Sequence, residues 1–444
     1  MKKVTLLAAS VLAGLMSAHA MAAPAEFNGY MRSGVMQGTS TYGHKALVSQ
    51  LGRLGNENDT FGEMQISADI AKVDDTVWTV STMFALGGDG KENNWDSNIS
   101  NRQFYAQVKG LLDKDAILWV GKKYVQREDI HLGDFYYYNV SGHGVGFEQL
   151  NVGTGKLSAA WTRNDNGSVK TGEYEDDWIF FKKAGQKDDA GNVLTGTPGT
   201  YVEGKVAKDV KVRLNVFDTR YSLPVWDGAT LQVGATYLRA LRDKNGAAGY
   251  ATWTDETEVK DAFNFTLELG LGFSAGWNKT VVQSFSGASA DCAWSTTADV
   301  KGDAFTGQGY RLLNFGDTHF TDNLGMFHQF NAAYSSSNKY DNKRTLSLVV
   351  RPYYKLTKMT KVLAELGAYV EREKAEDGSH VTAGGQKATL AYAISPDASN
   401  FWSRPEIRFY VSYINVTDKN GEFDNLGKKT GHDTVFGAQV EAWW

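Results

Sequence analysis

Apolar and polar side chains alternate along most of this 444-residue chain. Between Phe263 and Phe273 every odd position is phenylalanine or leucine, and every even position is polar or glycine. A period of two is that of a β-strand, whose successive side chains point to opposite faces of a sheet. No linker or composition shift interrupts the pattern, so it predicts an all-β protein. The same alternation recurs at residues 64–70, 78–86, 210–216, 346–350 and 407–413.

Two all-β architectures fit strands that carry only one apolar face. A soluble sheet of this size needs a second layer to cover its apolar faces, yet no helical period appears in the sequence. A barrel in a bacterial outer membrane turns its apolar face to lipid and its polar face to a wet lumen. At roughly 10 residues per tilted strand plus connections, the chain suffices for roughly 16 to 20 strands. The aromatic last residue, Trp444, suits the interfacial girdle of such a barrel.

The N-terminus has the pattern of a secretory signal. Lys2 and Lys3 precede an apolar run and then small residues that offer cleavage after Ala20 or Ala22. The apolar run is too short for a transmembrane helix. We therefore expect residues 1–22 to be a signal peptide and residues 23–444 to be a single barrel domain of the bacterial outer membrane.

Charge and cysteine content exclude several other classes of protein. The chain carries 46 basic and 51 acidic residues, and loss of the signal makes it more acidic, which argues against a nucleic-acid partner. Cys292 is alone, so neither an intramolecular disulfide nor a cysteine-rich metal site can form. We expect no cofactor and no metal.

Several strands place an aromatic ring in phase with charged residues, on the face expected to line the lumen. Tyr30 shares its phase with Arg32, and Phe61 shares its phase with Glu63. The same counting puts Trp402 and Trp443 beside arginine and glutamate residues. A pyranose has an apolar C–H face and a rim of hydroxyls, so rings flanked by charges suit a sugar ligand.

Seven segments of the sequence resemble the maltoporin family of sugar-specific outer-membrane porins, in family order. The resemblance implies an 18-stranded antiparallel barrel that forms homotrimers and whose third loop folds inward as a constriction. It also implies facilitated diffusion of maltose and maltodextrins across the outer membrane, without catalytic activity. The segments are residues 27–34, 53–57, 119–123, 126–131, 134–142, 402–405 and 436–444.

The resemblance also assigns residues to the sugar path. Strand phase does not support Arg102, which shares its phase with Phe104, so we expect Arg102 at a loop junction. Phe61 replaces a common tyrosine, and Trp277 replaces the phenylalanine of maltose-transporting members. The implied aromatic slide is Tyr30, Phe61, Trp95 on the second loop, Trp277, Trp402 and Trp443. The implied polar tracks are Arg32, Arg53, Glu63, Arg102, Arg127, Asp129 and Asp134, with Tyr136 at the constriction.

Other functions compete with this interpretation. A general diffusion porin shares the barrel, and a porin for another oligosaccharide such as sucrose shares the slide. A hydrolase would need a nucleophile beside a positioned histidine or aspartate, and no such motif accompanies His131 or His143. The expected partners are therefore maltose, maltodextrins or related oligosaccharides, and outer-membrane lipid.

Overall fold

A computed structural model shows how the strands assemble, and the prediction of an antiparallel barrel is confirmed. The structure describes residues 25–39, 47–88, 98–181, 186–188, 190–197, 200–240, 260–290, 307–337, 341–374, 380–418 and 430–444. The expected signal peptide, residues 1–22, lies outside the described residues. No helix in the described ranges has the length and hydrophobicity needed to cross a membrane.

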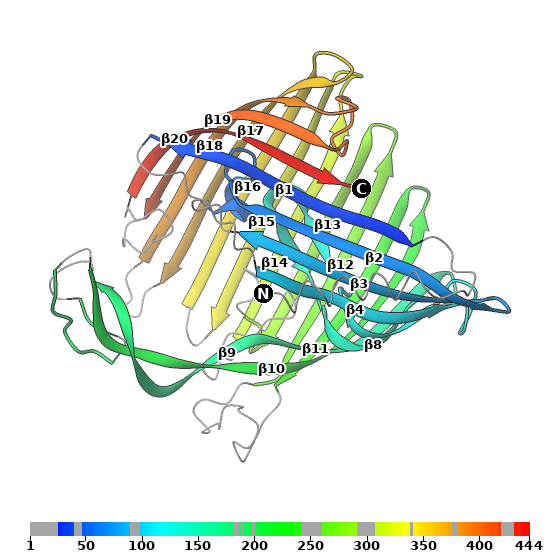
Figure 1. Ribbon diagram of the computed structural model, residues 1–444, viewed down its shortest axis with the longest axis horizontal. Helices are drawn as coiled ribbons and strands as arrows, with labels where there is room; N and C mark the ends of the chain where they lie inside the picture. The colour runs from blue at the N-terminus through cyan, green and yellow to red at the C-terminus, as the bar shows by residue number, and fades with distance from the viewer. Residues whose placement is uncertain are drawn as a thin grey trace, which may run out of the picture.

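Eighteen strands form one closed antiparallel sheet (Figure 1). Each pairs with its neighbour in the chain, and β1 also pairs with β20. Gly29 and Trp444 exchange backbone hydrogen bonds at this closure, with N···O distances of 3.0 and 3.1 Å. Closure leaves no sheet edge with unpaired backbone groups, which a membrane would not tolerate.

The barrel strands differ in length. The 27-residue strands β9 and β10 remain paired beyond the ends of their shorter neighbours and form a projecting hairpin (Figure 1). The strands are β1 (Glu26–Gly38), β2 (Thr60–Val73), β3 (Thr76–Gly88), β4 (Asn98–Lys109), β5 (Ile117–Lys123), β8 (Gly142–Val152), β9 (Gly155–Phe181), β10 (Thr200–Trp226), β11 (Ala229–Ala240), β12 (Ala262–Phe273), β13 (Gly276–Gly287), β14 (Gly307–His319), β15 (Leu324–Ser337), β16 (Asp341–Lys355), β17 (Thr360–Lys374), β18 (His380–Ile394), β19 (Glu406–Asp418) and β20 (Thr430–Trp443).

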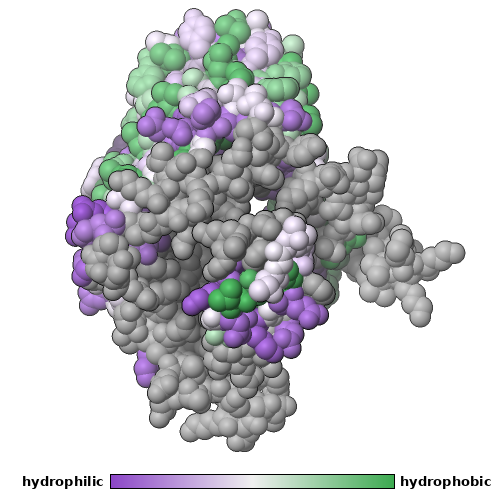
Figure 2. Space-filling view, turned by 90° about the vertical axis from the view of Figure 1, so that its left-hand side faces the viewer, coloured by the Kyte–Doolittle hydropathy of each residue, from purple (hydrophilic) through white to green (hydrophobic). Residues whose placement is uncertain are grey.

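The two faces of the barrel wall follow the alternation of the sequence. On β12, Phe263 and Phe265 are exposed on the outer face, whereas Thr266 and Glu268 are buried on the inner face. Figure 2 shows hydrophobic side chains gathered on the outer wall in the upper part of the view, bordered by hydrophilic residues. This is the arrangement of a barrel that exposes its apolar side to lipid.

A segment between β5 and β8 does not join the barrel wall. It contains β6 (Glu128–Ile130), the 3₁₀-helix η1 (His131–Gly133) and β7 (Phe135–Tyr138), with β6 and β7 paired as a separate two-stranded sheet. Its residues contact the inner faces of β10 to β15. We call residues 124–141 the inward segment. The short helix α2 (Val48–Leu51), between β1 and β2, lies beside η1, β16 and β17.

The inward segment corrects one expectation from the sequence. The apolar series at residues 210–216 was expected to face lipid, but Leu214 and Val216 are fully buried on the inner face of β10. They belong to one hydrophobic cluster with Ile130 and Tyr138 of the inward segment. Phe217, one position on, is exposed instead. The alternation was correct, but its direction was inverted because this part of the lumen is filled by protein.

Candidate functional site

A cavity of about 630 Å³ opens inside the barrel between the inward segment and the wall. Thirteen of the fourteen side chains assigned from the sequence line it, and the fourteenth, Trp95, lies outside the described residues. Four residues that the sequence analysis did not assign line it as well. The thirteen are Tyr30, Arg32, Arg53, Phe61, Glu63, Arg102, Arg127, Asp129, Asp134, Tyr136, Trp277, Trp402 and Trp443, and the four are Tyr124, His131, Phe315 and Phe327.

Aromatic rings form a connected row along one side of this cavity. Tyr30 and Phe61 have ring centroids 6.2 Å apart, and Tyr30 pairs across the sheet with Trp443. Trp443 lies 6.2 Å from Trp402. The row continues from Trp402 through Phe327 and Trp277 to Phe315, with centroid separations of 5.9, 5.6 and 5.9 Å. We call these seven residues the aromatic row.

Trp402 reaches the cavity by a different route from the one expected. Its spacing in the sequence places Trp402 in strand phase with Arg404, but β19 begins at Glu406, and Trp402 lies in the turn before it. Asn400 Oδ1 accepts a hydrogen bond from the Trp402 backbone N–H at 2.8 Å, which fixes the turn. The ring is 37% exposed, so a ligand can reach it.

Arg127 holds a polar part of the cavity lining together. Its guanidinium lies over the rings of Tyr136 and Tyr124, at 3.9 and 4.3 Å from their centroids. It also lies 3.8 Å from Glu63, whose carboxylate accepts a hydrogen bond from the Tyr124 hydroxyl at 2.7 Å. A stacked guanidinium keeps its in-plane N–H donors available at the edge of the ring. Hydroxyl-bearing ligands can therefore bind here.

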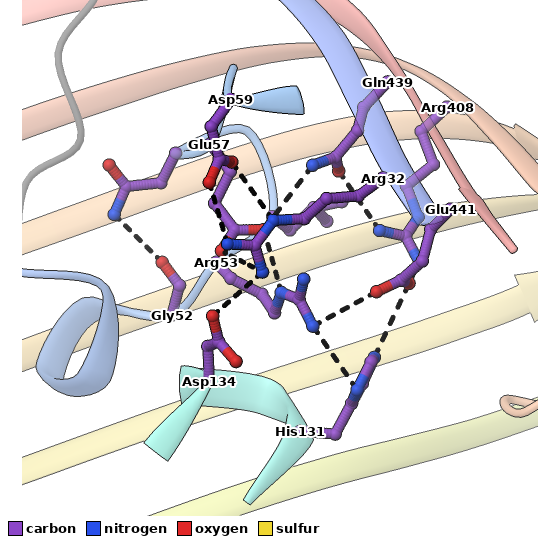
Figure 3. Close-up of polar contacts among 12 residues, drawn as sticks. Arg32, Gly52, Arg53, Glu57, Asp59, His131, Asp134, Arg408, Gln439 and Glu441 are labelled. Carbon is purple, nitrogen blue, oxygen red and sulfur yellow. Dashed lines mark hydrogen bonds and ion pairs between the residues drawn. The ribbon is translucent and has the colours of Figure 1, made fainter. Parts of the chain in front are cut away.

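A network of charges joins Arg53, Arg408 and Glu441 (Figure 3) and reaches the aromatic row at Tyr30. Glu441 of β20 accepts a hydrogen bond from the Tyr30 hydroxyl at 3.0 Å and pairs with Arg53 at 3.1 Å and Arg408 at 2.7 Å. Arg404 also pairs with the same carboxylate, at 2.8 Å. Burial makes such pairs costly to break, because one partner would remain as an unpaired charge. This network fixes the orientation of Tyr30.

Arg32 links the wall of the barrel to the inward segment. It binds Asp59 with two nitrogens, at 3.1 and 2.8 Å, and Asp134 at 2.9 Å (Figure 3). Asp134 has a positive φ of 49° at the end of η1, a conformation that aspartate tolerates better than most residues. The pKa of Asp134 is lowered despite its burial, because Arg53 and Arg32 stabilise its charge. Arg32 is therefore already engaged by carboxylates.

Arg102 lies inside β4, not at the loop junction expected from its phase. Asn101 and Gln103 pair with the neighbouring residues Phe84 and Met83 of β3, so Arg102 is the extra residue of a β-bulge. A bulge shifts the phase of a strand and re-aims a side chain. This explains why Arg102 lines the cavity although it counts with the outward-facing Phe104.

The four unassigned lining residues differ in whether their strand phase could have identified them from the sequence. Phe315 shares its strand phase with Arg311 and Asp317, so the rule that identified Phe61 would have identified it too. Tyr124 and His131 come from the inward segment, where strand phase says nothing. Burial lowers the pKa of His131 to about 4, so its ring is neutral at pH 7 although Glu441 lies 3.6 Å away. The ring packs against Trp402 and Trp443, at 5.2 and 5.7 Å between centroids.

The far side of the inward segment faces two further cavities, of about 430 and 490 Å³. Glu128 lines both of them, whereas the adjacent Asp129 lines the cavity of the aromatic row. Glu128 pairs with Lys279 at 3.1 Å and accepts a hydrogen bond from Tyr137 at 3.1 Å. Within the described ranges no three His, Cys, Asp or Glu side chains gather as metal ligands would. Consecutive residues of β6 thus serve two compartments.

Comparison with known proteins gives one family along nearly the whole chain. The family model of the LamB porin matches residues 25–444. Maltoporin 2 of Yersinia pestis is 30% identical over 443 residues, which cover 94% of each chain. Maltoporin 1 of Klebsiella pneumoniae subsp. pneumoniae is 30% identical over 462 residues, covering 99% of this chain and 98% of its own. Among solved structures, OccD3 of Pseudomonas aeruginosa aligns over 95% of this chain and 91% of its own, at 8% identity and a TM-score of 0.48.

Proposed function

The chain belongs to the LamB porin family, and from this premise we propose that it carries maltose and maltodextrins by facilitated diffusion along the aromatic row. It is an outer-membrane sugar porin, a channel without catalytic activity. What we propose is that maltodextrins are its preferred sugars. We also propose that the signal peptide at residues 1–22 is cleaved, that the chain assembles as a homotrimer in outer-membrane lipid, and that sugar first contacts Trp95.

The observation that carries the proposal is the continuity of the aromatic row in a cavity that charged side chains also line. Seven rings follow one another at centroid separations near 6 Å, or as direct cross-strand neighbours, along the same cavity. Pyranose rings can stack on Tyr30, Phe61, Trp443, Trp402 and Trp277 in turn while Glu63, Arg127 and Asp129 exchange hydrogen bonds with the sugar hydroxyls. Phe315 and Phe327, only 3% and 1% exposed, pack against Trp277 and support it. A general diffusion porin would gain nothing from such a row.

Passage requires that no position along the row binds tightly. Stacking contributes roughly 0.5–1.5 kcal/mol per ring, and a sugar can exchange one ring for the next without losing every contact at once. We expect a dissociation constant in the millimolar to sub-millimolar range, equivalent to roughly 4–6 kcal/mol. The inward segment, with Tyr136 held under Arg127, is the proposed constriction. Arg32 pairs with the carboxylates of Asp59 and Asp134, and these contacts stabilise the shape of the opening.

One observation favours a short oligosaccharide such as sucrose as a second candidate. Trp277 packs edge-to-face against Phe315 and Phe327, at 5.9 and 5.6 Å, where the resemblance leads us to expect the smaller phenylalanine. A wider ring reduces the space at this end of the aromatic row. This would disfavour long chains more than disaccharides.

Single-channel current in a planar bilayer tests both candidates. Maltose, maltotriose, maltohexaose and sucrose would be titrated against the full mature chain. Saturable block that tightens with maltodextrin length supports the proposal, and block by sucrose alone supports the second candidate. Ohmic current that no sugar blocks would show that neither is right.

A variant of the row sharpens this test. Trp402→Ala should weaken block by the preferred sugar roughly three- to tenfold, the loss of one stacking contact. Ion conductance should stay equal or rise, because the pore widens. Trp226→Ala, which removes a 59% exposed tryptophan that does not line the cavity, is the matched control. Unchanged sugar block in Trp402→Ala would contradict the assignment of the aromatic row.

A further inference from the structure

Two arginines lie directly opposite each other on the outer face of the barrel. Arg344 of β16 and Arg372 of β17 are cross-strand partners, and both are exposed. Their neighbours Thr345 and Glu371 take the inner face, where the Thr345 hydroxyl donates to Glu371 at 2.9 Å. Side chains that pair across an antiparallel sheet have Cβ atoms roughly 4.5–5.5 Å apart. The two guanidinium groups can therefore converge on one ligand.

Nothing in the described part of the chain neutralises this pair. The acidic side chains nearest in sequence, Glu371 and Glu373, point inward and pair with Lys343 at 3.3 and 3.9 Å. Arg344 lies over the ring of Tyr334, 5.7 Å from its centroid, and Arg372 is opposite the uncharged Thr382. Like charges directly opposite one another destabilise a sheet. The pair therefore favours an anionic ligand that lies against both side chains.

The pair lies at the border of an apolar surface. Two positions along each strand, on the same outer face, are Leu346 and Val370, which are 48% and 45% exposed. Leu348 and Leu366 continue this surface further from the arginines, at 49% and 52% exposure. Beside the pair, Tyr310 and Tyr334 stack with centroids 6.4 Å apart, as girdle aromatics do at a membrane interface. The two tyrosines and the two arginines thus form one row across the strands, and the apolar surface begins two positions further along β16 and β17.

The position along the strands shows which membrane surface this border faces. β16 and β17 are joined by a short turn between Lys355 and Thr360, and the arginines lie at the opposite end of both strands. Short turns of outer-membrane barrels lie on the periplasmic side. The pair therefore lies at the level of the outer leaflet, where a charge on the lipid face costs little.

We propose that Arg344 and Arg372 form a binding site for the phosphate groups of lipopolysaccharide in the outer leaflet. Each guanidinium can bind a phosphate through two N–H groups, and the acyl chains would lie along Leu346, Leu348 and Val370. The lipid class matches the site because it carries phosphorylated sugars directly above its acyl chains. The inference rests on outer-membrane location and does not depend on which sugar the pore carries.

The opposite wall offers a matched control. Arg163 of β9 also lies on the outer face, beside the stacked rings of Trp161 and Phe217. Its guanidinium donates two hydrogen bonds, each 3.3 Å long, to Asn215 of β10. A side-chain amide already engages it, and its cross-strand partners are Asn215 and His143, not a second arginine. Arg163→Gln removes one outward-facing charge without touching the proposed site.

Binding of purified lipid A to the detergent-solubilised full mature chain tests the proposal. The double variant R344Q/R372Q should bind bisphosphorylated lipid A roughly ten- to thirtyfold more weakly than the wild type, as expected for two basic side chains near an anionic surface. Arg163→Gln should change the affinity less than twofold. Wild-type binding should also weaken severalfold when the lipid phosphates are removed. Native mass spectrometry measures all three affinities, and unchanged sugar block in the double variant shows that the barrel is folded.

Other results would overturn the proposal. Equal affinity in the wild type and the double variant, or indifference to the lipid phosphates, would show that the arginines do not hold this lipid. Inorganic phosphate binding as tightly as lipid A would identify a free anion as the ligand instead. A double variant that loses contact between copies of the chain, with unchanged lipid binding, would assign the pair to a subunit interface.

Discussion

The inner wall of this barrel is built in two different ways. Where the inward segment covers β10 to β15, apolar inner-face side chains such as Leu214 and Val281 are fully buried, next to buried polar ones such as Asp218 and Glu268 that bond to the segment. Where β1, β2 and β20 face the cavity, the inner side chains are rings beside charges, such as Tyr30 beside Arg32. Both walls have the same period of two. Whether an inner side chain is packed against protein or open to the cavity therefore depends on the inward segment and is not set by the barrel alone.

The boundary between these two regions is a single hairpin. Glu128 and Asp129 are consecutive residues of β6, and a strand sends consecutive side chains to opposite faces. Glu128 faces the two cavities against β8 to β13, and Asp129 faces the cavity of the aromatic row. The hairpin divides the lumen, so a mutation on each of its sides should have a separable effect.

The largest effect is expected where the inward segment is anchored to the wall. Tyr138 is fully buried, donates its hydroxyl to Asp218 at 2.7 Å and lies under Arg220. Tyr138→Ala should lower the free energy of unfolding by about 3–5 kcal/mol, because it leaves a cavity and unpaired polar groups. It should also raise single-channel conductance as the segment loosens. Denaturant unfolding and bilayer recordings measure the two effects.

The control for the anchor is Tyr392→Ala, which removes a tyrosine 42% exposed on the outer face. It should leave the conductance unchanged. A Tyr138→Ala barrel that is destabilised but conducts like the wild type would show that the segment keeps its position without this anchor. The distinction between covered and open wall would then not depend on Tyr138.

A pH effect is expected at His131, where the inward segment meets the aromatic row. Burial lowers its pKa from 6.5 to about 4, so between these values the unfolded chain binds the proton and the folded chain does not. Stability contributed by the neutral ring is therefore present above pH 6.5 and is lost as pH falls toward 4. The loss is at most about 3 kcal/mol. His131→Gln should flatten this part of the curve of unfolding free energy against pH. An identical slope in both proteins would show that His131 does not cause the pH dependence.

Neutralising each side of the hairpin should separate sugar binding from ion flow. Asp129→Asn should weaken sugar block roughly three- to tenfold, because one charged hydrogen-bonding group of the aromatic-row cavity is lost. Glu128→Gln should leave sugar block within twofold of the wild type and shift the ratio of cation to anion permeability. Current recordings under a salt gradient, with and without sugar, measure both quantities. Equal effects of the two variants on sugar block would show that the hairpin does not divide the lumen.

The smallest effect is expected from restoring a hydroxyl to the row. Phe61→Tyr keeps the ring beside Tyr30 and adds one donor near the charged edge of Arg32, whose guanidinium lies 5.5 Å from the Phe61 centroid. Maltodextrin block should tighten about two- to fivefold, which is the contribution of one net hydrogen bond. The matched change Phe409→Tyr, on the exposed outer face, should do nothing. Looser block in Phe61→Tyr would mean that the cavity has no room for the hydroxyl.

The barrel itself was predictable because strand alternation is a local property. The family resemblance, the all-β class and the strand number near 18 are all confirmed. Tyr30, Phe61 and Trp443 could be placed on the inner face by counting in twos, since no register shift separates them from Arg32, Glu63 and Glu441, the charged residues of the same phase. Their role in sugar binding stays a prediction.

Counting failed where the chain departs from regular pairing. Arg102 was misplaced because a bulge inserts one residue, and Trp402 because it lies in a turn. The direction of Leu214 and Val216 was inverted because their cover comes from a segment some 80 residues earlier in the chain. None of these features can be predicted from the local pattern of hydrophobicity.

The sequence by itself determined the strands, their alternation and the closed sheet that such strands need in a membrane. These follow from backbone hydrogen bonding and from the period of a pleated strand, both of which act between near neighbours. Only the tertiary structure decided which inner positions face water and which face protein. That choice depends on where residues 124–141 pack, and packing joins side chains far apart in the sequence, such as Tyr138 and Asp218, through contacts that no local pattern encodes.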